Sequence, residues 1–206
     1  MTESLLAPAR LLAVRDILSC LPAGSHAEAI FGSCTTSVRQ YIAIEAYREL
    51  SRPLGALIAS RSLCFLRPEP PLIYPSTEVD AGKLWEQGAG LAVQHIELRN
   101  SVINVLCGQT AERERCVVTA SLYISQLGST SMSEHVDAWD AWLLQVEGRK
   151  CFKVRRQRSG QENFDLSAGD WLFIPKDTPH AVSTPSPLSI HLSINLHRQR
   201  QIFLTN

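Results

Sequence analysis

The sequence predicts a mainly β protein with helices in its N-terminal part, and two observations support this. Up to about residue 60, apolar residues recur at helical spacing, whereas from about residue 91 onward short runs of Val, Ile, Leu and aromatic residues alternate with turn signals. Several strands spaced in this way, without helical patterns between them, indicate an antiparallel sandwich or a small barrel. We therefore expect a single domain over residues 1–206, with a mostly helical part and a Pro-rich connector over 1–87 and a β-barrel core over 88–200.

The first part contains two predicted helices and an extended connector. The second helix covers Ser37–Leu50 and is broken at Pro53. The connector over 67–77 contains four prolines, which exclude a helix or an interior strand, although its apolar residues can still pack. The first helix ends at Pro22 and Gly24, and its apolar positions are Leu11, Leu12, Val14, Ile17 and Leu18.

The second part contains one predicted helix followed by strands. The helix lies around Asn100–Cys107. Each strand is a short run rich in Val, Ile, Leu or aromatic residues and bounded by turn signals. The five candidates are Val117–Ser125, Trp142–Val146, Lys150–Arg155, Trp171–Ile174 and Leu188–Leu196.

Composition and charge exclude several classes of protein. Lys+Arg and Asp+Glu are both 20, so the basic excess of a dedicated nucleic-acid binder is absent. No stretch reaches the roughly 18 apolar residues of a membrane span, and none of the six cysteines lies in a C-x-x-C pair typical of a zinc site. Glu3 precedes the apolar N-terminal stretch and Arg10 and Arg15 interrupt it, which argues against a secretory signal. We expect a cytoplasmic protein with reduced thiols and neither a nucleic-acid nor a membrane partner.

Three residues of the second part carry metal-ligand chemistry. His135 and Asp137 are two positions apart, so in a strand their side chains point to the same face. His180 follows the predicted strand Trp171–Ile174 and begins the next one, and an antiparallel barrel can bring it opposite the pair. Two imidazoles and one carboxylate on one side of a metal match the facial triad of non-haem Fe(II) oxygenases. The alternatives are a surface His–Asp pair and a turn histidine beside Pro179.

Two further patterns indicate a buried anion and a cavity. Lys150 shares the predicted apolar face of its strand with Phe152 and Val154, where a lysine is unfavourable unless an anion meets it. A carboxylate-bearing ligand inside a barrel is one such partner, and the alternative is a strand-end lysine that reaches solvent. Residues 188–196 alternate between an apolar and a polar face, so the polar face meets either solvent or an active-site cavity. Its members are Ser189, His191, Ser193 and Asn195.

Three segments together resemble the JmjC-type, cupin-like 2-oxoglutarate oxygenases. They are HVDAWDAWLLQVEGRK (His135–Lys150), LSAGDWLFIPKDTPH (Leu166–His180) and SIHLSINL (Ser189–Leu196). The similarity covers roughly residues 88–200 and is closest to the ribosomal-oxygenase branch, whose bacterial members hydroxylate arginine in a ribosomal protein. The resemblance implies a double-stranded β-helix, also called a jelly-roll or cupin-like barrel. It also implies a dioxygenase that uses Fe(II), 2-oxoglutarate and O2.

The resemblance assigns roles to individual residues. In this family an H-x-D pair and a distal histidine bind Fe(II), which makes His135, Asp137 and His180 the implied metal-binding and catalytic residues. A Lys or Arg fifteen residues after the first histidine binds the far carboxylate of 2-oxoglutarate. Lys150 occupies this position.

The remaining candidate residues lie close to this set. Ser193 and Asn195 are expected to contact the cosubstrate or a metal-bound water. Trp139 is expected either to form a wall of the pocket or to pack in the core, and Asp140 to orient a neighbour or a substrate guanidinium or amine. Tyr123 is expected in the core.

Three functions are compatible with these residues. The first is hydroxylation of an amino-acid side chain in a protein or peptide. The second is hydroxylation of a free or carrier-bound small molecule, such as an amino acid in a biosynthetic pathway. The chain ends at Asn206, soon after the last predicted strand, so we expect a bare catalytic domain, which slightly favours this second function. The third is a non-catalytic cupin-like binding module, and the intact metal and carboxylate residues argue against it. Hydroxylation, demethylation and desaturation stay open as outcomes, and so does the oligomeric state.

Overall fold

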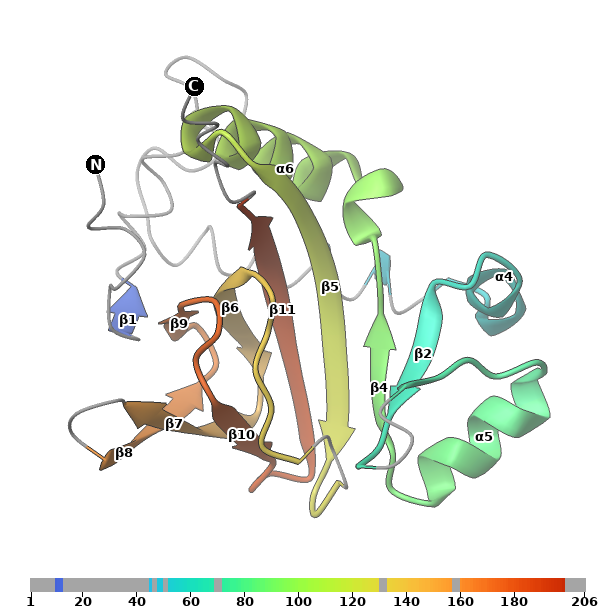
Figure 1. Ribbon diagram of the computed structural model, residues 1–206. Coiled ribbons are helices and arrows are strands. Elements are labelled where there is room, and N and C mark those ends of the chain that lie inside the picture. Colours follow the sequence, from blue (N-terminus) through green and yellow to red (C-terminus); the bar gives the residue numbers. More distant parts are fainter. Residues whose placement is uncertain are drawn as a thin grey trace, which may run out of the picture.

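Two antiparallel sheets with helices on one side make up the fold (Figure 1). The computed structural model describes residues 10–12, 45, 48–49, 52–68, 72–129, 133–156 and 160–198. The helices are α4 (Leu54–Ala59), α5 (Glu78–Glu86), the short 3-10 helix η2 (Ile96–Leu98) and α6 (Ser101–Glu114). The strands are β1 (Arg10–Leu12), β2 (Leu63–Leu66), β3 (Leu72–Ile73), β4 (Gly90–Val93), β5 (Val117–Gln126), β6 (Asp140–Glu147), β7 (Arg149–Arg156), β8 (Gly160–Ser167), β9 (Trp171–Ile174), β10 (His180–Ser183) and β11 (Leu188–His197). No helix in the described part of the chain is long and apolar enough to cross a membrane.

The larger sheet has the strand order β1-β9-β6-β11-β5-β4-β2-β3, and its central strands are buried on both faces. On one face, Leu122 and Leu192 pack in a core that includes Ile103 of α6. On the other face, Leu143 packs with Phe152 of the smaller sheet, which has the order β10-β7-β8. Because successive side chains of a strand point to opposite faces, one strand serves both layers. Several of the candidate side chains named from the sequence line a cavity between the two sheets.

The predicted elements of the second part are confirmed, most of them with longer bounds. Strand β9 has the predicted bounds, β5 and β11 extend one residue further at one end, and β6 and β7 extend one or two residues further at both ends. Helix α6 begins where Asn100 accepts hydrogen bonds at Oδ1 from the backbone N of Val102 and Ile103, both at 3.1 Å. It continues to Glu114 and ends at Arg115, which has a positive φ of 51°. A polar side chain that accepts backbone N–H groups therefore defines the start of the helix.

The first predicted helix is wrong at Leu11 and Leu12, which lie in strand β1. This strand pairs with β9 in the register Leu11↔Leu172, so it occupies the edge of the larger sheet beside β9. A short apolar run fits a helix or an edge strand equally well by spacing, and long-range pairing decides between them. Val14, Ile17 and Leu18 lie outside the described residues. Within the second predicted helix, Glu45, Arg48 and Glu49 are described and are helical.

Three strands have no clear signature in the sequence. Strands β2 and β4 are four-residue apolar runs, which periodicity does not distinguish from buried helix segments. Strand β8 is mostly polar because it lies at the edge of the smaller sheet and pairs only with β7. In the proline-rich connector, β3 pairs with β2 at the edge of the larger sheet, where prolines nearby are tolerated. Since β2 and β3 belong to this sheet, it extends across the expected division at residue 87.

Candidate metal centre

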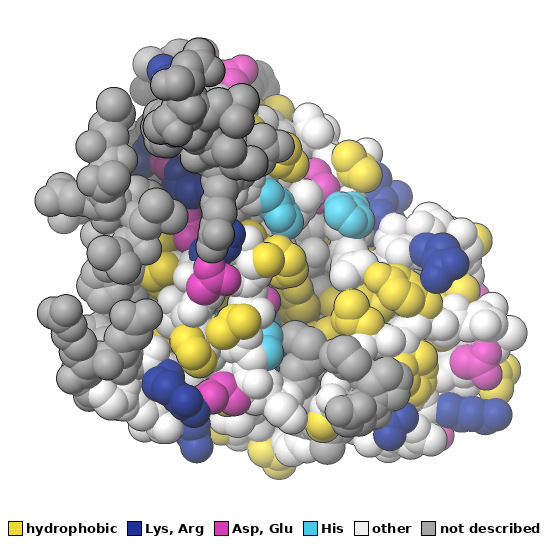
Figure 2. All heavy atoms as spheres, in the orientation of Figure 1, with side chains coloured by type: hydrophobic (Ala, Val, Ile, Leu, Met, Phe, Trp, Pro, Cys, Tyr) yellow, Lys and Arg dark blue, Asp and Glu magenta, His cyan; other side chains and the backbone are white. Residues whose placement is uncertain are grey.

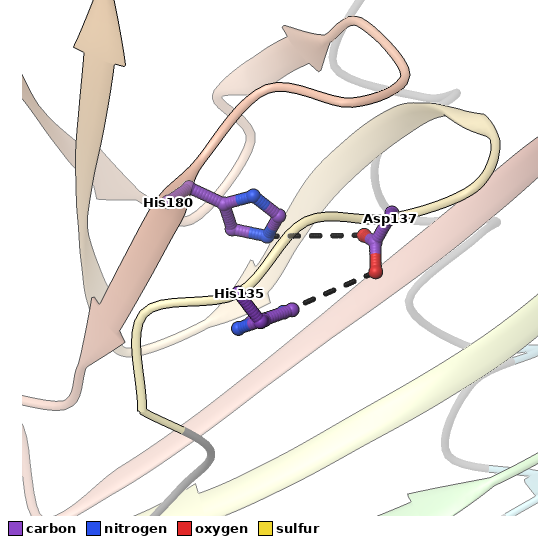
Figure 3. A group of neighbouring side chains, drawn as sticks. All are labelled: His135, Asp137 and His180. Atoms are coloured by element: carbon purple, nitrogen blue, oxygen red, sulfur yellow. Dashed lines mark ion pairs between the residues drawn. The ribbon is translucent and has the colours of Figure 1, made fainter.

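Two histidines and one aspartate converge at the end of strand β10 (Figure 3). His135 Nε2 lies 3.9 Å from Asp137 Oδ1, and His180 Nε2 lies 3.8 Å from Asp137 Oδ2. All three candidate ligand atoms lie within 4.8 Å of one another. Metal–ligand bonds of about 2.0–2.2 Å hold neighbouring ligand atoms roughly 3.0–3.6 Å apart, so a metal ion fits after a small contraction.

Backbone carbonyl groups hold both histidines in the tautomer that leaves Nε2 free to bind a metal. The Nδ1 atom of His135 lies 2.9 Å from the carbonyl oxygen of Ser133, and the Nδ1 atom of His180 lies 2.9 Å from that of Thr178. A carbonyl only accepts, so each Nδ1 carries the proton and each Nε2 keeps its lone pair on the side of Asp137. Burial also lowers the pKa of His180, which favours the neutral imidazole. The donor set therefore fits a divalent metal with nitrogen and oxygen ligands.

The backbone at this site differs in detail from the predicted strand. His135 forms an isolated bridge with His180, the first residue of β10, and Asp137 lies in the loop before β6. The loop is held in place where the backbone N of Asp177 donates to the carbonyl oxygen of Asp137 at 2.9 Å. The three side chains therefore converge because a short loop that contains His135 and Asp137 is bridged to the start of β10, and not because the two residues belong to a regular strand.

The metal centre opens into a cavity between the two sheets. Its wall includes the apolar side chains of Phe152 and Ile174, and its polar lining includes Tyr123 and His191. In the orientation of Figure 1, Figure 2 shows hydrophobic side chains across the middle of this face, with histidine side chains beside them. An apolar cavity with a few convergent polar groups is the usual form of a small-molecule site.

Lys150 lines the same cavity and is 3% exposed. Its predicted place on the apolar face beside Phe152 and Val154 is confirmed, since all three are buried. The Nζ atom donates to the hydroxyl oxygens of Ser125 and Thr184, the latter at 3.1 Å, and no carboxylate of the described residues forms an ion pair with it. Burial lowers the pKa of this ammonium to about 8. Among the described residues this buried cation has only hydroxyl partners, and burial of a charge without an opposite charge is energetically costly.

Residues 94–203, more than half of the chain, match the family model of the JmjC domain. The chain belongs to the JmjC domain family. This JmjC domain is similar to proteins described as bifunctional lysine-specific demethylase and histidyl-hydroxylase NO66. The relative from Drosophila mojavensis is 30% identical over 116 residues, and that from Caenorhabditis elegans is 31% identical over 117 residues. Each match covers 46% of this chain but only 13% and 16% of the respective relative, so the chain spans a small part of their length.

Solved structures of an Escherichia coli ribosomal oxygenase, YcfD, share the fold of this JmjC domain. One has a TM-score of 0.58 at 16% sequence identity, and the match covers 73% of this chain and 45% of YcfD. The structure of YcfD in complex with cobalt and 2-oxoglutarate gives the same values. The predicted double-stranded β-helix and the predicted JmjC resemblance are therefore confirmed.

The JmjC domain brings some of the remaining candidate residues to the cavity and not others. Ser193 lines it and donates to Asn195 Oδ1 at 2.6 Å, whereas Asn195 is buried and is not among the lining residues. Trp139 lines the cavity and also packs beside its apolar core. Asp140 faces elsewhere, because it accepts hydrogen bonds from the backbone N of Lys176 at 2.8 Å and from Nε of Arg198 at 2.7 Å. It orients neighbours, as one of the two predicted roles states, and it is not among the cavity-lining residues.

Sequence reasoning misses Tyr123 as a cavity residue. It packs against the core cluster of Cys64, Leu66 and Ala92, as expected, but it also lines the cavity, where its ring stacks on His191 with a centroid distance of 4.9 Å. The signal lies in β5, where polar residues alternate with apolar ones as they do in β11. Residues of the two strands pair directly, in the register His191↔Tyr123 and Ser189↔Ser125, so two polar faces combine to form one cavity wall. Thr184, the second hydroxyl partner of Lys150, has no such signal.

Proposed function

We propose that this JmjC domain is an Fe(II)- and 2-oxoglutarate-dependent oxygenase that hydroxylates an amino-acid side chain in a protein or peptide. One observation carries the proposal. A two-histidine, one-carboxylate centre lines the same cavity as a buried ammonium that has no carboxylate partner among the described residues. That pairing suits a ligand with a metal-chelating end and an anionic end, which describes 2-oxoglutarate. The cobalt and 2-oxoglutarate in the complex of YcfD, a protein of the same fold, support the choice.

His135, Asp137 and His180 would hold Fe(II) through Nε2 and carboxylate atoms. The carbonyl groups of Ser133 and Thr178 keep the imidazoles in the metal-binding tautomer before any metal arrives. When bound, Fe(II) and 2-oxoglutarate supply the oxidising chemistry, in which O2 is consumed, 2-oxoglutarate becomes succinate and CO2, and one oxygen atom enters a C–H bond of the substrate.

Lys150 would bind the far carboxylate of 2-oxoglutarate and thereby set its distance from the metal. The hydroxyl groups of Ser125 and Thr184 hold the ammonium in position without neutralising it. The apolar wall formed by Phe152, Ile174 and Val182 excludes water, which strengthens the attraction between the ammonium and a carboxylate.

The relatives favour a protein substrate over the alternatives. The similar NO66 proteins are named as histidyl hydroxylases and lysine demethylases, and YcfD is named as a ribosomal oxygenase. Peptides from ribosomal proteins are therefore the first substrates to examine. No residue of the described cavity favours a free small molecule specifically, and a binding module does not require a metal triad.

The test is spectroscopic first and chemical second. Without oxygen, the full chain with Fe(II) and 2-oxoglutarate should develop the weak visible charge-transfer band of a chelated site, and a His135→Ala variant should not. After admission of oxygen, succinate formation and mass spectrometry of ribosomal-protein peptides should reveal the gain of one oxygen atom. The absence of both the band and succinate from the unmodified protein would refute the proposal. If free amino acids are oxidised and no peptide is, the substrate is a small molecule and not a protein.

A further inference from the structure

His191 is a buried histidine that lines the cavity, and one of its ring nitrogens has no hydrogen-bond partner in the part of the chain that the structure describes. It lies on β11, lines the cavity and is 6% exposed. Its Nδ1 atom is buried and forms no hydrogen bond with any described residue. A buried polar atom left unpaired destabilises a fold by about 1–3 kcal/mol, so it calls for a physical explanation.

Two aromatic side chains, those of Tyr123 and Phe152, fix the orientation of the His191 ring. On one side it is stacked on Tyr123, with centroids 4.9 Å apart and an angle of 9° between the planes. Phe152 contacts it edge-on at 5.9 Å, with an angle of 82°. Aromatic neighbours on two sides fix the plane of an imidazole but offer its nitrogens no strong partner. The other two histidines of the cavity, His135 and His180, each have a backbone carbonyl group beside Nδ1.

The electrostatic surroundings make His191 a neutral hydrogen-bonding group. Burial, and after it the positive charge of Lys150, hold its pKa well below the ordinary value. A neutral imidazole has one N–H donor and one acceptor nitrogen. Lys150 faces the same cavity, so an anion bound by its ammonium brings oxygen atoms into the space that His191 lines.

We propose that His191 binds the dicarboxylate directly, by donating a hydrogen bond from its ring N–H to a carboxylate oxygen of 2-oxoglutarate. This inference rests on the proposed function and adds a ligand-binding residue to it. The imidazole and the ammonium then contact one anion, and the dicarboxylate supplies the acceptor that the described chain does not. A hydrogen bond to a charged group contributes roughly 1.5–3 kcal/mol, so its loss should weaken binding by about ten- to 150-fold.

The experiment compares two substitutions at His191 with one matched control on the same strand. His191→Phe keeps the stacked ring and removes both nitrogens, whereas His191→Asn keeps a polar N–H near the position of Nδ1. His197→Phe is the control, because His197 is also on β11 and bonds Thr119 but is not among the cavity-lining residues. For each full-length variant, calorimetry without oxygen measures Mn(II) binding, 2-oxoglutarate binding to the Mn(II) form, and the thermal unfolding midpoint.

We expect His191→Phe to weaken 2-oxoglutarate binding at least about tenfold while Mn(II) binding and the unfolding midpoint are retained. His191→Asn should bind 2-oxoglutarate more tightly than His191→Phe, and His197→Phe should bind it as the unmodified protein does. His191→Phe removes the unpaired buried nitrogen. If His191 had only a structural role, this variant would therefore show unchanged or greater stability and unchanged binding of 2-oxoglutarate.

The outcomes separate this inference from the proposed function. If the unmodified Mn(II) protein binds 2-oxoglutarate and His191→Phe binds it equally well, the inference fails and the proposed function stands. If His191→Asn binds as weakly as a folded His191→Phe, ring packing rather than a hydrogen bond explains the loss, and the inference also fails. If His191→Phe does not fold, retained binding in His191→Asn with loss in His191→Ala supports the inference, and equal binding in both overturns it. If the unmodified protein binds no 2-oxoglutarate, both proposals fail together.

Discussion

His135 and His180 are joined by two backbone hydrogen bonds: the N–H of His135 donates to the carbonyl of His180 at 3.0 Å, and the N–H of His180 donates to that of His135 at 2.9 Å. Their rings lie 4.3 Å apart between centroids. The pairing depends on main-chain atoms only, so it brings the two imidazoles together before a metal is present. A centre organised in this way loses little conformational entropy when the metal binds.

Replacement of His135 by alanine should therefore abolish metal binding without unfolding the protein. The backbone bridge to His180 is kept, while one of three ligands is lost. Loss of an outer-shell partner alone typically costs 10- to 100-fold in metal affinity, and loss of a ligand should cost more. Mn(II) titration followed by electron paramagnetic resonance measures the affinity, and circular dichroism checks the fold. His95→Asn is a control, since His95 is half-exposed, pairs with Glu97 and is not among the cavity-lining residues. Metal binding that survives in His135→Ala would remove His135 from the centre.

Replacement of Lys150 by methionine should separate stability from binding. Methionine fills a similar volume without a buried charge, so the unfolding midpoint of the unliganded protein should be equal or higher. Binding of 2-oxoglutarate should weaken at least about tenfold, because the carboxylate loses its cationic partner. Lys153→Met is the matched control, because Lys153 belongs to the same strand, β7, but lies on its opposite, exposed face. Unchanged affinity in Lys150→Met would exclude Lys150 as the carboxylate partner.

The affinity for 2-oxoglutarate should fall as the pH rises through about 8. Burial lowers the pKa of Lys150 from 10.5 to about 8 in the unliganded protein, and only the ammonium form attracts a carboxylate. Above that pH the dissociation constant should rise by up to about tenfold per pH unit. Titration calorimetry of the Mn(II) form at a series of pH values measures this. A Lys150→Arg variant that still binds should show a flatter profile, since arginine stays charged. A flat profile in the unmodified protein would contradict the prediction.

The lowered pKa of Lys150 has the opposite effect on the stability of the unliganded protein: stability should increase with pH where the affinity for 2-oxoglutarate decreases. Between about pH 8 and 10.5 the unfolded chain keeps a proton on Lys150 that the folded chain has released. The contribution of Lys150 to the free energy of unfolding therefore rises with pH across this window. Urea denaturation of the unmodified protein and of Lys150→Met, compared pH by pH, isolates this contribution. A difference between the two that does not change with pH would argue against the lowered pKa.

Replacement of Asp140 by asparagine should affect stability rather than cosubstrate binding. The carboxylate accepts hydrogen bonds from Arg198 and from the backbone of Lys176, and it is 7% exposed. Loss of its charge should lower the free energy of unfolding by about 1–3 kcal/mol. Urea denaturation measures the stability, and the affinity for 2-oxoglutarate should change by less than about twofold, because Asp140 is not among the cavity-lining residues. Unchanged stability together with lost turnover would instead support a role in substrate binding.

Much of the candidate site is predictable because strand periodicity and spacing carry local information. His135, Asp137 and His180 are identified by their chemistry and order along the chain, and the place of Lys150 on the buried face follows from the alternation in β7. What spacing does not reveal is which buried face meets a cavity and which meets a core. Tyr123 illustrates this, because both faces of β5 are largely buried and only the smaller sheet makes one of them a cavity wall.

Long-range partners account for the other differences. Asp140 is directed away from the cavity by Arg198, which is 58 residues later in the chain, and no local pattern reports that pairing. Leu11 and Leu12 are in a strand because β9 offers an edge, although their spacing also fits a helix. His191 is visible in the sequence only as one member of a polar face. Its unpaired nitrogen and its stacking on Tyr123 emerge only from the packed structure.

In the part of the chain that the structure describes, the larger sheet ends in very short strands on both sides, β1 with three residues and β3 with two. An outermost strand presents backbone N–H and C=O groups that another molecule can pair with, and the length of the strand limits how many such bonds can form. A second copy of the chain could therefore form only a few backbone hydrogen bonds with either edge strand of the larger sheet. At these two edges of the larger sheet the geometry favours resistance to edge-to-edge aggregation, even though the strands at the centre of the sheet are long and largely buried.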